Sequence, residues 1–404
     1  MENKPAAIPP GDRIFNMAPL LRPTPGNIVT WIILALGLAV TIIRFTMGIG
    51  AATNLDDNQP WGLWIGFDLL CGVCLAAGGY FTTVACYVMG MKRFHSAVRP
   101  AVTTAFLGYL FVVFALLYDL GHPLRLPYMF FFPGTTSVLF EVGLCVATYL
   151  TVLFVEFSVA PMEWLSRRFP FLIGCRAFVN RITILLTIFG MTLSTLHQSS
   201  LGSLFLIVPG KLHPLWYSPF LPLFFFVSSM AAGASMVIFE GMFAHKGAHQ
   251  YMDAAHRRDA DHVALSFSRA ASFILFAYFM LKLTDMLAQA NAPYLLTGYG
   301  LWWMAEMLLF VLLPALLYAK GASSGDIGLC RAASANAVAG IVLNRFNVCL
   351  IAYNWQLPSS ERYVPHIMEI CISVFIVTLI VTCYRFIVYH MPVLHEHPDF
   401  RDPH

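Results

Sequence analysis

The sequence predicts an all-α membrane protein with about ten transmembrane helices, and its composition, apolar runs and loop charges support this prediction. Of the 404 residues, 58% are hydrophobic and only 11% are charged, whereas a soluble domain has about 25% charged residues. The polar residues are too few to cover a surface that faces water. The apolar runs are about 20 residues long, and this length favours helices over a barrel of alternating ten-residue strands.

Each apolar run is long enough to cross about 30 Å of hydrocarbon at about 1.5 Å per residue. The ten runs are 28–50, 61–90, 99–120, 136–160, 177–197, 217–244, 263–288, 299–319, 331–353 and 365–390. The chain therefore divides into an N-terminal tail (1–27), a polytopic transmembrane domain (28–390) and a C-terminal tail (391–404).

Lysine and arginine are concentrated in every second loop. The loops after the second, fourth, sixth and eighth runs carry two or three basic residues each, whereas the opposite loops carry one or none. Basic loops remain on the cytoplasmic side. Both tails of this multi-pass protein are therefore predicted to be cytoplasmic.

Ionisable residues inside the runs gather near their outer ends. An intramembrane charge costs at least about 2.5–3.5 kcal/mol, so such groups rarely face lipid. One interpretation is a structural ion-pair network, such as Lys282 with Glu306 or Arg44 with Asp68. The interpretation that we favour is a polar cavity on the outer side. The acids near the outer ends are Asp68, Asp119, Glu141, Glu306 and Glu369, and those of the inner half are Glu156 and Glu240.

Residues 195–204 form a polar segment, Thr-Leu-His-Gln-Ser-Ser-Leu-Gly-Ser-Leu, at the outer end of the fifth run. It is interpreted either as a helix-end cap, with His197 bonded to a carbonyl, or as the wall of a site. A haem held by two histidines is not expected, because no run carries a histidine at mid-membrane depth. No four-cysteine run of ferredoxin type is present, so no iron–sulfur cluster is expected in this chain. Neither a metal site nor a nucleic-acid partner is indicated.

Proton-linked quinone chemistry fits the remaining residues. A quinone headgroup needs hydrogen-bond donors for two carbonyls and a route for two protons, and histidine donates or accepts near neutral pH. We therefore expect menaquinone or ubiquinone as substrate, with His197, Asp68 and Glu141 as catalytic residues. The expected headgroup contacts are Trp64, Asp119, His122, Gln198 and Ser199. The expected proton pathway is Glu156, Glu240, Glu306 and Glu369.

A weak internal similarity links residues 62–68 (GLWIGFD) and 300–306 (GLWWMAE). A duplicated bundle would explain it, and so would chance combined with the preference of tryptophan for membrane interfaces.

Several motifs occur in order along the first six runs: WGLWIGFDLL at 61–70, HSAVRP at 95–100, SVLFE at 137–141, LHQSSLGSL at 196–204, HPLW at 213–216 and VIFEG at 237–241. With these motifs the chain resembles the NrfD/PsrC-like integral membrane subunits, and in particular the HybB-type subunit of hydrogenase-2-like complexes. DsrP-type subunits of sulfite-reduction-linked complexes share the motifs.

The resemblance implies a protein of a bacterial or archaeal inner membrane, with NrfD-like helical bundles without haem and a quinone pocket near the outer face. It implies a periplasmic ferredoxin-like iron–sulfur subunit and a catalytic subunit, either a nickel–iron hydrogenase or another redox enzyme. The chain would pass electrons between that iron–sulfur subunit and the quinone pool. Proton or ion translocation, simple membrane anchoring and a DsrP-type role are the alternatives.

Overall fold

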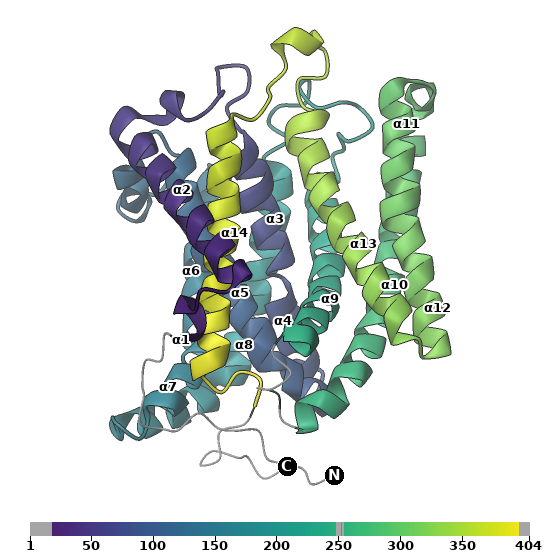
Figure 1. Cartoon of the computed structure of the whole chain (residues 1–404). Coiled ribbons are helices and arrows are strands. Elements are labelled where there is room, and N and C mark those ends of the chain that lie inside the picture. Colours follow the sequence, from purple (N-terminus) through teal and green to yellow (C-terminus); the bar gives the residue numbers. More distant parts are fainter. Residues whose placement is uncertain (1–17, 248–251, 253, 396–404) are drawn as a thin grey trace.

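The computed structural model describes residues 18–247, 252 and 254–395. This part of the chain contains ten helices long and apolar enough to span a membrane, which confirms the predicted fold class. The upper end of the molecule is where α2 ends and α14 begins, and the lower end is where α2 begins and α14 ends (Figure 1). Residues 1–17 and 396–404 of the two predicted tails lie outside the described residues.

The ten spans are numbered in chain order. In the first half, span 1 is α2 (Pro25–Met47); span 2 is η2 (Trp64–Leu69), α3 (Leu70–Leu75), α4 (Gly78–Thr83) and η3 (Val84–Val88); span 3 is η4 (Lys92–Phe94) and α5 (His95–Asp119); span 4 is α6 (Val138–Phe157) and α7 (Val159–Leu165); span 5 is α8 (Phe171–Ser203). In the second half, span 6 is α9 (Leu221–Gly247); span 7 is α10 (Ala254–Ala288); span 8 is α11 (Gly298–Ala305), η8 (Glu306–Leu312) and α12 (Leu313–Ser324); span 9 is α13 (Ile327–Phe346) and η9 (Asn347–Ile351); span 10 is α14 (Ile367–His390). Shorter helices are α1 (Ala18–Leu21), η1 (Ile49–Ala51), η5 (Pro123–Phe130), η7 (Ala292–Leu296) and η10 (Ser359–Glu361).

The fifth span is longer than its apolar run predicts. The run ends at residue 197, but α8 continues to Ser203. Within the last turns the hydroxyl of Ser200 donates to the Leu196 carbonyl at 3.0 Å, and Ser203 donates to Ser199 at 3.3 Å. These contacts keep both hydroxyls within hydrogen-bonding reach of the helix backbone, and residues 195–203 of the polar segment are helical rather than a loop.

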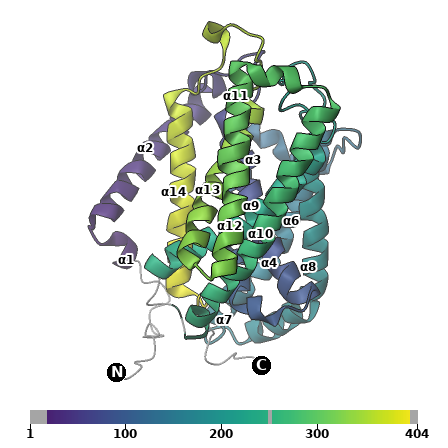
Figure 2. The same cartoon turned by 90° about the vertical axis from the view of Figure 1, so that its right-hand side faces the viewer.

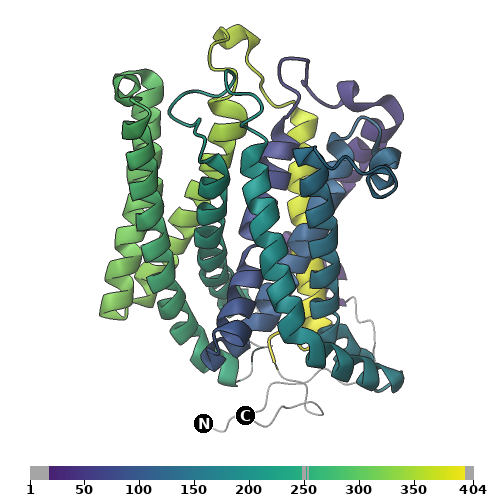
Figure 3. The same cartoon turned by 180° about the vertical axis from the view of Figure 1, so that it is seen from behind.

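Spans 2 to 5 form one four-helix bundle, bundle A, and spans 6 to 9 form a second, bundle B. Each helix of a bundle packs against the next, and the fourth packs back against the first. Span 10 lies against span 1, α5 and η2, so spans 1 and 10 cover one side of bundle A (Figures 1 and 2). Seen from behind, α10 and α12 of bundle B stand at the opposite edge of the molecule (Figure 3).

The two bundles meet where small residues let backbones approach closely. A Cβ atom on Gly233 of α9 would lie 2.8 Å from the Ala77 carbonyl carbon of span 2, and one on Gly78 would lie 3.2 Å from the Gly233 oxygen. Nearer the upper end, a Cβ on Gly202 of α8 would lie 2.6 Å from the Leu221 oxygen. Close approach of this kind favours helix packing in membranes.

A buried cluster of ion pairs joins the helices at the lower end of bundle A. Both guanidinium nitrogens of Arg99 donate to Glu163, at 2.8 and 2.9 Å, and Arg176 Nε donates to the same carboxylate at 2.7 Å. Glu163 is fully buried. Arg99 also donates to the carbonyl of Pro392 at 3.0 Å, so spans 3, 4 and 5 and the segment after α14 share one anchor.

Spans 2 and 8, which share the internal similarity, occupy different places in their bundles. Both contain a wider π-helical stretch, at Trp64–Leu69 and Glu306–Leu312. Span 2 packs against α9 and α13 of the other bundle, whereas span 8 packs against α10 and α13 of its own bundle. Span 8 is the third helix of bundle B and corresponds to span 4, so the similarity does not mark equivalent positions.

Candidate functional site

His197 lies in the core of bundle A and is fully buried. Its Nδ1 is 2.7 Å from the Leu193 carbonyl, one turn earlier in α8, and its Nε2 is 2.5 Å from the Tyr109 hydroxyl on α5. A carbonyl only accepts, so Nδ1 carries the proton and Nε2 accepts from Tyr109. The Tyr149 ring of α6 lies 5.7 Å from the imidazole. Three helices of bundle A therefore fix this histidine.

Neighbouring side chains of α8 extend the His197 site towards other helices. Gln198 Nε2 donates to the Val73 carbonyl of span 2 at 3.0 Å. Nearer the upper end, the Ser200 hydroxyl donates to Glu141 Oε1 at 2.8 Å. Glu141 is exposed in the first turn of α6, and Ser199 is half-buried. The Glu141–Ser200 pair thus lies between the membrane-facing surface and the buried histidine.

Several buried hydroxyls of bundle A have no hydrogen-bond partner among the described residues. They are Tyr80 of span 2, Tyr149 of span 4 and Ser194 of span 5. Buried polar groups are normally paired with protein or with ordered water. These hydroxyls therefore mark positions where water, or the polar part of a bound molecule, completes the hydrogen bonding of the bundle.

Asp68 and Trp64 face span 10 instead of His197. Asp68 Oδ2 accepts from the Ser373 hydroxyl at 2.6 Å, and Trp64 Nε1 donates to the Glu369 carbonyl at 3.2 Å. The Glu369 carboxylate is fully buried and accepts from the Tyr363 hydroxyl and from the Asn54 amide. These acids form a second cluster, between spans 2 and 10.

Arg44 and Asp119 lie at the edge of this second cluster. Arg44 donates to the carbonyls of Tyr118 and Leu120, at 2.7 Å each, and not to Asp68. Asp119 Oδ1 is buried and without a partner among the described residues. His122 is exposed in the loop that follows. The structure therefore does not bring Asp68, Trp64, Asp119 or His122 to His197.

Glu306 forms a third cluster, in bundle B. Its carboxylate accepts from Trp216 Nε1 at 2.8 Å, from Asn344 Nδ2 at 2.6 Å and from Asn347 Nδ2 at 2.6 Å. No ion pair within 4.0 Å joins Glu306 to Lys282 among the described residues. The carboxylate is held by neutral donors from the loop before α9 and from span 9.

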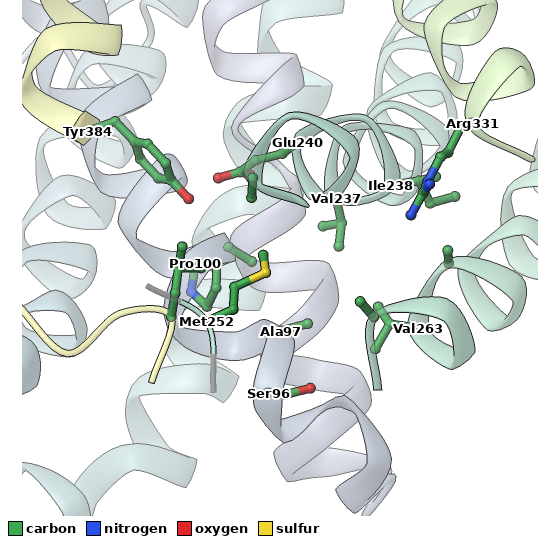
Figure 4. A pocket seen from close by; sticks show the side chains of 16 residues that line it. Ser96, Ala97, Pro100, Val237, Ile238, Glu240, Met252, Val263, Arg331 and Tyr384 are labelled. Atoms are coloured by element: carbon green, nitrogen blue, oxygen red, sulfur yellow. The ribbon is translucent and has the colours of Figure 1, made fainter. Parts of the chain in front are cut away.

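The two remaining acids lie in the lower half. Glu240 accepts from the Thr104 hydroxyl, and Glu156 accepts from Thr187 at 3.3 Å. Glu240 borders a small pocket of about 80 Å³ between α5, α9, α10 and α14. Figure 4 shows the Glu240 carboxylate and the Tyr384 hydroxyl pointing towards one another at one end of this pocket, with Arg331 on its far side.

His213 is buried in an aromatic cluster of the upper loops. It lies 4.7 Å from the rings of both Tyr299 and Trp355 and 5.6 Å from Trp216, and its Nδ1 accepts from the Leu215 amide at 3.2 Å. Burial lowers the pKa of His213 from 6.5 to about 4. The histidine is therefore neutral near pH 7, and it positions Trp216 above Glu306.

Sequence reasoning missed the partners that hold the acids and the histidine. They are Tyr109, Trp216, Asn344, Asn347 and Ser373. The HPLW motif at 213–216 was the one sequence signal that included any of them. Within the described ranges, no group of three or more histidine, cysteine or acidic residues is arranged to hold a metal ion.

Comparison with known proteins shows relatives that match most of the chain. A protein of Nitratidesulfovibrio vulgaris is 65% identical over 94% of this chain and 97% of its own length. The probable Ni/Fe-hydrogenase 2 b-type cytochrome subunit of Escherichia coli is 28% identical over 92% of this chain and 95% of its own. The menaquinone reductase integral membrane subunit of N. vulgaris is 27% identical over 82% of each chain.

The two relatives whose names specify a role are membrane subunits of redox enzyme complexes. The family model described as polysulphide reductase, NrfD, matches residues 51–355, which is most of the membrane domain. The resemblance seen in the sequence motifs, including its HybB-type character, is confirmed. The chain is a multi-pass integral membrane protein that belongs to the polysulphide reductase NrfD family.

Proposed function

We propose that this chain is the quinone-reactive membrane subunit of a respiratory oxidoreductase. It exchanges electrons between a periplasmic ferredoxin-like iron–sulfur subunit and menaquinone or ubiquinone in the membrane. The relatives support this proposal, because one of them is named as the integral membrane subunit of a menaquinone reductase. The catalytic subunit is a nickel–iron hydrogenase or another redox enzyme, which docks through the iron–sulfur subunit.

The observation that carries the proposal is the His197–Tyr109 pair with the Glu141–Ser200 pair above it. Two protons accompany two electrons in quinone chemistry, so a reactive site needs groups that give and take protons. The imidazole accepts a bond from a phenol at 2.5 Å, and Ser200, three residues along α8, bonds the exposed carboxylate. Histidine and carboxylate are general acid–base groups suited to this task.

The orientation follows from the basic loops and places the upper end at the periplasmic face. The tails 1–27 and 391–404 then lie in the cytoplasm, on either side of the membrane domain 28–390. The iron–sulfur subunit would dock over the upper loops, above His197 and the aromatic cluster around His213. Asp68 and Asp119 lie at the same end and are proposed to relay protons or to contact the headgroup from the side of span 10.

Haem does not fit His197, although the name of the E. coli relative includes a b-type cytochrome. Haem of this type needs free imidazole nitrogens on facing helices. Both nitrogens of His197 are engaged, and its ring contacts are Tyr109 and Tyr149 rather than a second histidine. We therefore propose electron transfer directly to quinone from the partner subunit.

The proposal is tested in the purified complex with His197→Gln and Asp68→Asn variants. Quinone-linked turnover is expected to fall strongly in the His197 variant, while assembly and dye-linked activity of the catalytic partner stay at the wild-type level. His262→Gln is a matched control, because His262 is exposed in the first turns of α10, in the other bundle. Full quinone-linked turnover in both test variants would contradict the proposal.

A second candidate function is proton translocation driven by the quinone chemistry. The observation that favours it is Glu240 at the inner end of the lower pocket, with Glu156 also half-buried in the lower half of bundle A. The protons released per electron in liposomes test it. A ratio no higher than quinone chemistry alone requires would count against translocation.

A further inference from the structure

Three charged side chains of bundle B lie in its core and are not needed for quinone chemistry in bundle A. Lys282, Glu306 and Arg345 are 4%, 2% and 1% exposed. All three oxygen contacts of Glu306 come from neutral groups, Trp216, Asn344 and Asn347. The carboxylate is therefore satisfied without help from the lysine.

Lys282 has no comparable partner. Among the described residues its ammonium donates no hydrogen bond and makes no salt bridge within 4.0 Å, and it lies 4.5 Å from the centre of the Phe224 ring. The charged groups within its electrostatic reach are Glu306 on span 8, Asp285 on its own helix and Arg345 on span 9. The facing turn of α9 contributes the Phe224 ring to Lys282, and Ser228 and the Phe225 carbonyl to Arg345. Asp285 is itself bonded by Ser218 and Gln289.

This arrangement suits a group that exchanges a proton better than a fixed ion pair. A buried lysine is stable when it can lose its proton, and lysine does so readily in apolar surroundings. A metal cation does not fit, because Arg345 and Lys282 would repel it and three N–H donors already occupy the carboxylate of Glu306. The exchangeable ligand of this cluster is therefore a proton.

Below the cluster, bundle B holds buried hydroxyls that lack partners. Ser268 of α10, Tyr318 of α12 and Ser235 of α9 are fully buried, and their oxygens have no hydrogen-bond partner within the described part of the chain. They come from three of the four helices of the bundle and lie nearer the lower end than Lys282. Tyr318 and Ser235 lie close enough to interact with each other, and ordered water normally bonds such buried groups. The lower half of bundle B therefore holds polar positions at which a proton can be taken up.

Arg345 connects this cluster to the His197 site. Its Nη1 donates to Asn344 Oδ1 at 2.8 Å, and its Nη2 lies 3.4 Å from Cys74 Sγ in span 2. The residue before Cys74 is Val73, whose carbonyl accepts from Gln198. One turn of span 2 thus contacts both Arg345 of bundle B and Gln198, the residue next to His197.

We propose that Lys282 is the proton-binding group of a second route through bundle B, coupled to the His197 site through Arg345 and residues 73–74 of span 2. The inference rests on the proposed quinone function, which supplies the driving reaction. Only a proton moves: Lys282 Nζ receives it from the lower half of the bundle, where these hydroxyls lie, and releases it towards the upper end, where Glu306 lies. No covalent bond forms and no further reactant is needed.

The test uses the whole complex in proteoliposomes with three variants, Lys282→Met, Lys282→Arg and the control Lys92→Met, whose lysine is exposed in η4. Quinone-linked turnover is measured with a protonophore, and protons released per electron are measured without it. We expect all variants to keep turnover within about twofold of wild type. Lys282→Met and Lys282→Arg should lower the proton ratio to that of quinone chemistry alone, because arginine keeps its charge but does not release its proton.

The outcomes separate the two proposals. Lack of quinone-linked turnover in the wild-type complex would overturn the proposed function. Normal turnover with an unchanged proton ratio in both Lys282 variants would overturn the assignment of Lys282 and leave the proposed quinone function standing. If Lys282→Met fails to assemble, the arginine variant decides, since it retains the charge and the length of the side chain.

Discussion

The hydroxyl of Tyr109 lies 2.5 Å from Nε2 of His197, in a fully buried contact between α5 and α8. The other ring nitrogen of His197 donates to the carbonyl of its own helix. Among the described residues, the phenol is thus the one group in hydrogen-bond contact with Nε2, the nitrogen that accepts a proton. The relationship gives the histidine a defined tautomer and a defined proton donor.

Replacement of Tyr109 by phenylalanine should therefore impair proton transfer without leaving a large cavity in the core. We expect quinone-linked turnover to fall by about 100-fold or more, the range that general acid–base groups contribute. Steady-state assays with quinone and with a dye that reacts at the partner subunit measure this loss. Tyr128→Phe in the exposed η5 helix is the control. Equal activity of the two variants would show that the Tyr109 hydroxyl takes no part.

Loss of the carboxylate at Glu163 should destabilise the lower end of bundle A. Arg99 and Arg176 both donate to this buried acid, and removal of one partner leaves buried charge uncompensated, at a cost of about 3–5 kcal/mol. We expect Glu163→Gln to unfold at a clearly lower temperature in detergent than wild type. Glu361→Gln, in exposed η10, is the control and should unfold like wild type. If Glu163→Gln also unfolds like wild type, the ion cluster around Glu163 does not stabilise the lower end of bundle A.

The contact between the bundles should not tolerate a side chain at Gly233. A Cβ atom there would lie 2.8 Å from the backbone of Ala77, so Gly233→Leu must push span 6 away from span 2. Lower thermal stability and faster proteolysis of the purified protein are expected. On α8, Gly174 has open space around its Cβ position, and Gly174→Leu should behave like wild type in the same assays.

His213 should make the upper loops sensitive to acid. Burial lowers its folded-state pKa to about 4 from 6.5, so the unfolded chain binds the proton more readily than the folded chain does. Stability is therefore unaffected by this group above about pH 6.5 and is lost as the pH falls from there towards about 4. Unfolding temperatures measured across this range should fall less in His213→Phe than in wild type. Parallel curves would show that His213 does not contribute.

The ten spans were predictable because each is a long apolar run, and the acids were predictable as unusual residues within them. The neighbours of each acid were not. Asp68 and Val73 lie on one helix, yet Asp68 meets Ser373 of span 10 and the Val73 carbonyl meets Gln198 of span 5. The π-helical stretch at Trp64–Leu69 also changes the direction of the side chains before it relative to those after it, and a regular period of about 3.6 residues does not anticipate that change.

The prediction of one shared outer cavity depended on acids that lie at similar depth in the membrane. Depth alone does not determine towards which helix each carboxylate points. Glu141 reaches the His197 helix through Ser200, whereas Glu306 is held by Trp216 in the other bundle. The sequence does not show which helix of a bundle stands beside which, so it does not assign these partners. The motifs at 196–204 and 213–216 nevertheless fall on the His197 site and on the loop above Glu306.

The central claim, that quinone reacts in the upper half of bundle A, is tested most directly by photolabelling the purified complex with an azido-quinone and mapping the labelled peptides. We predict labels in the upper parts of spans 2 to 5, on peptides that include residues 61–75, 137–150 and 194–204. His197→Gln should reduce this labelling, and excess unmodified quinone should abolish it. Labelling confined to bundle B or to the lower pocket beside Glu240 would contradict the account.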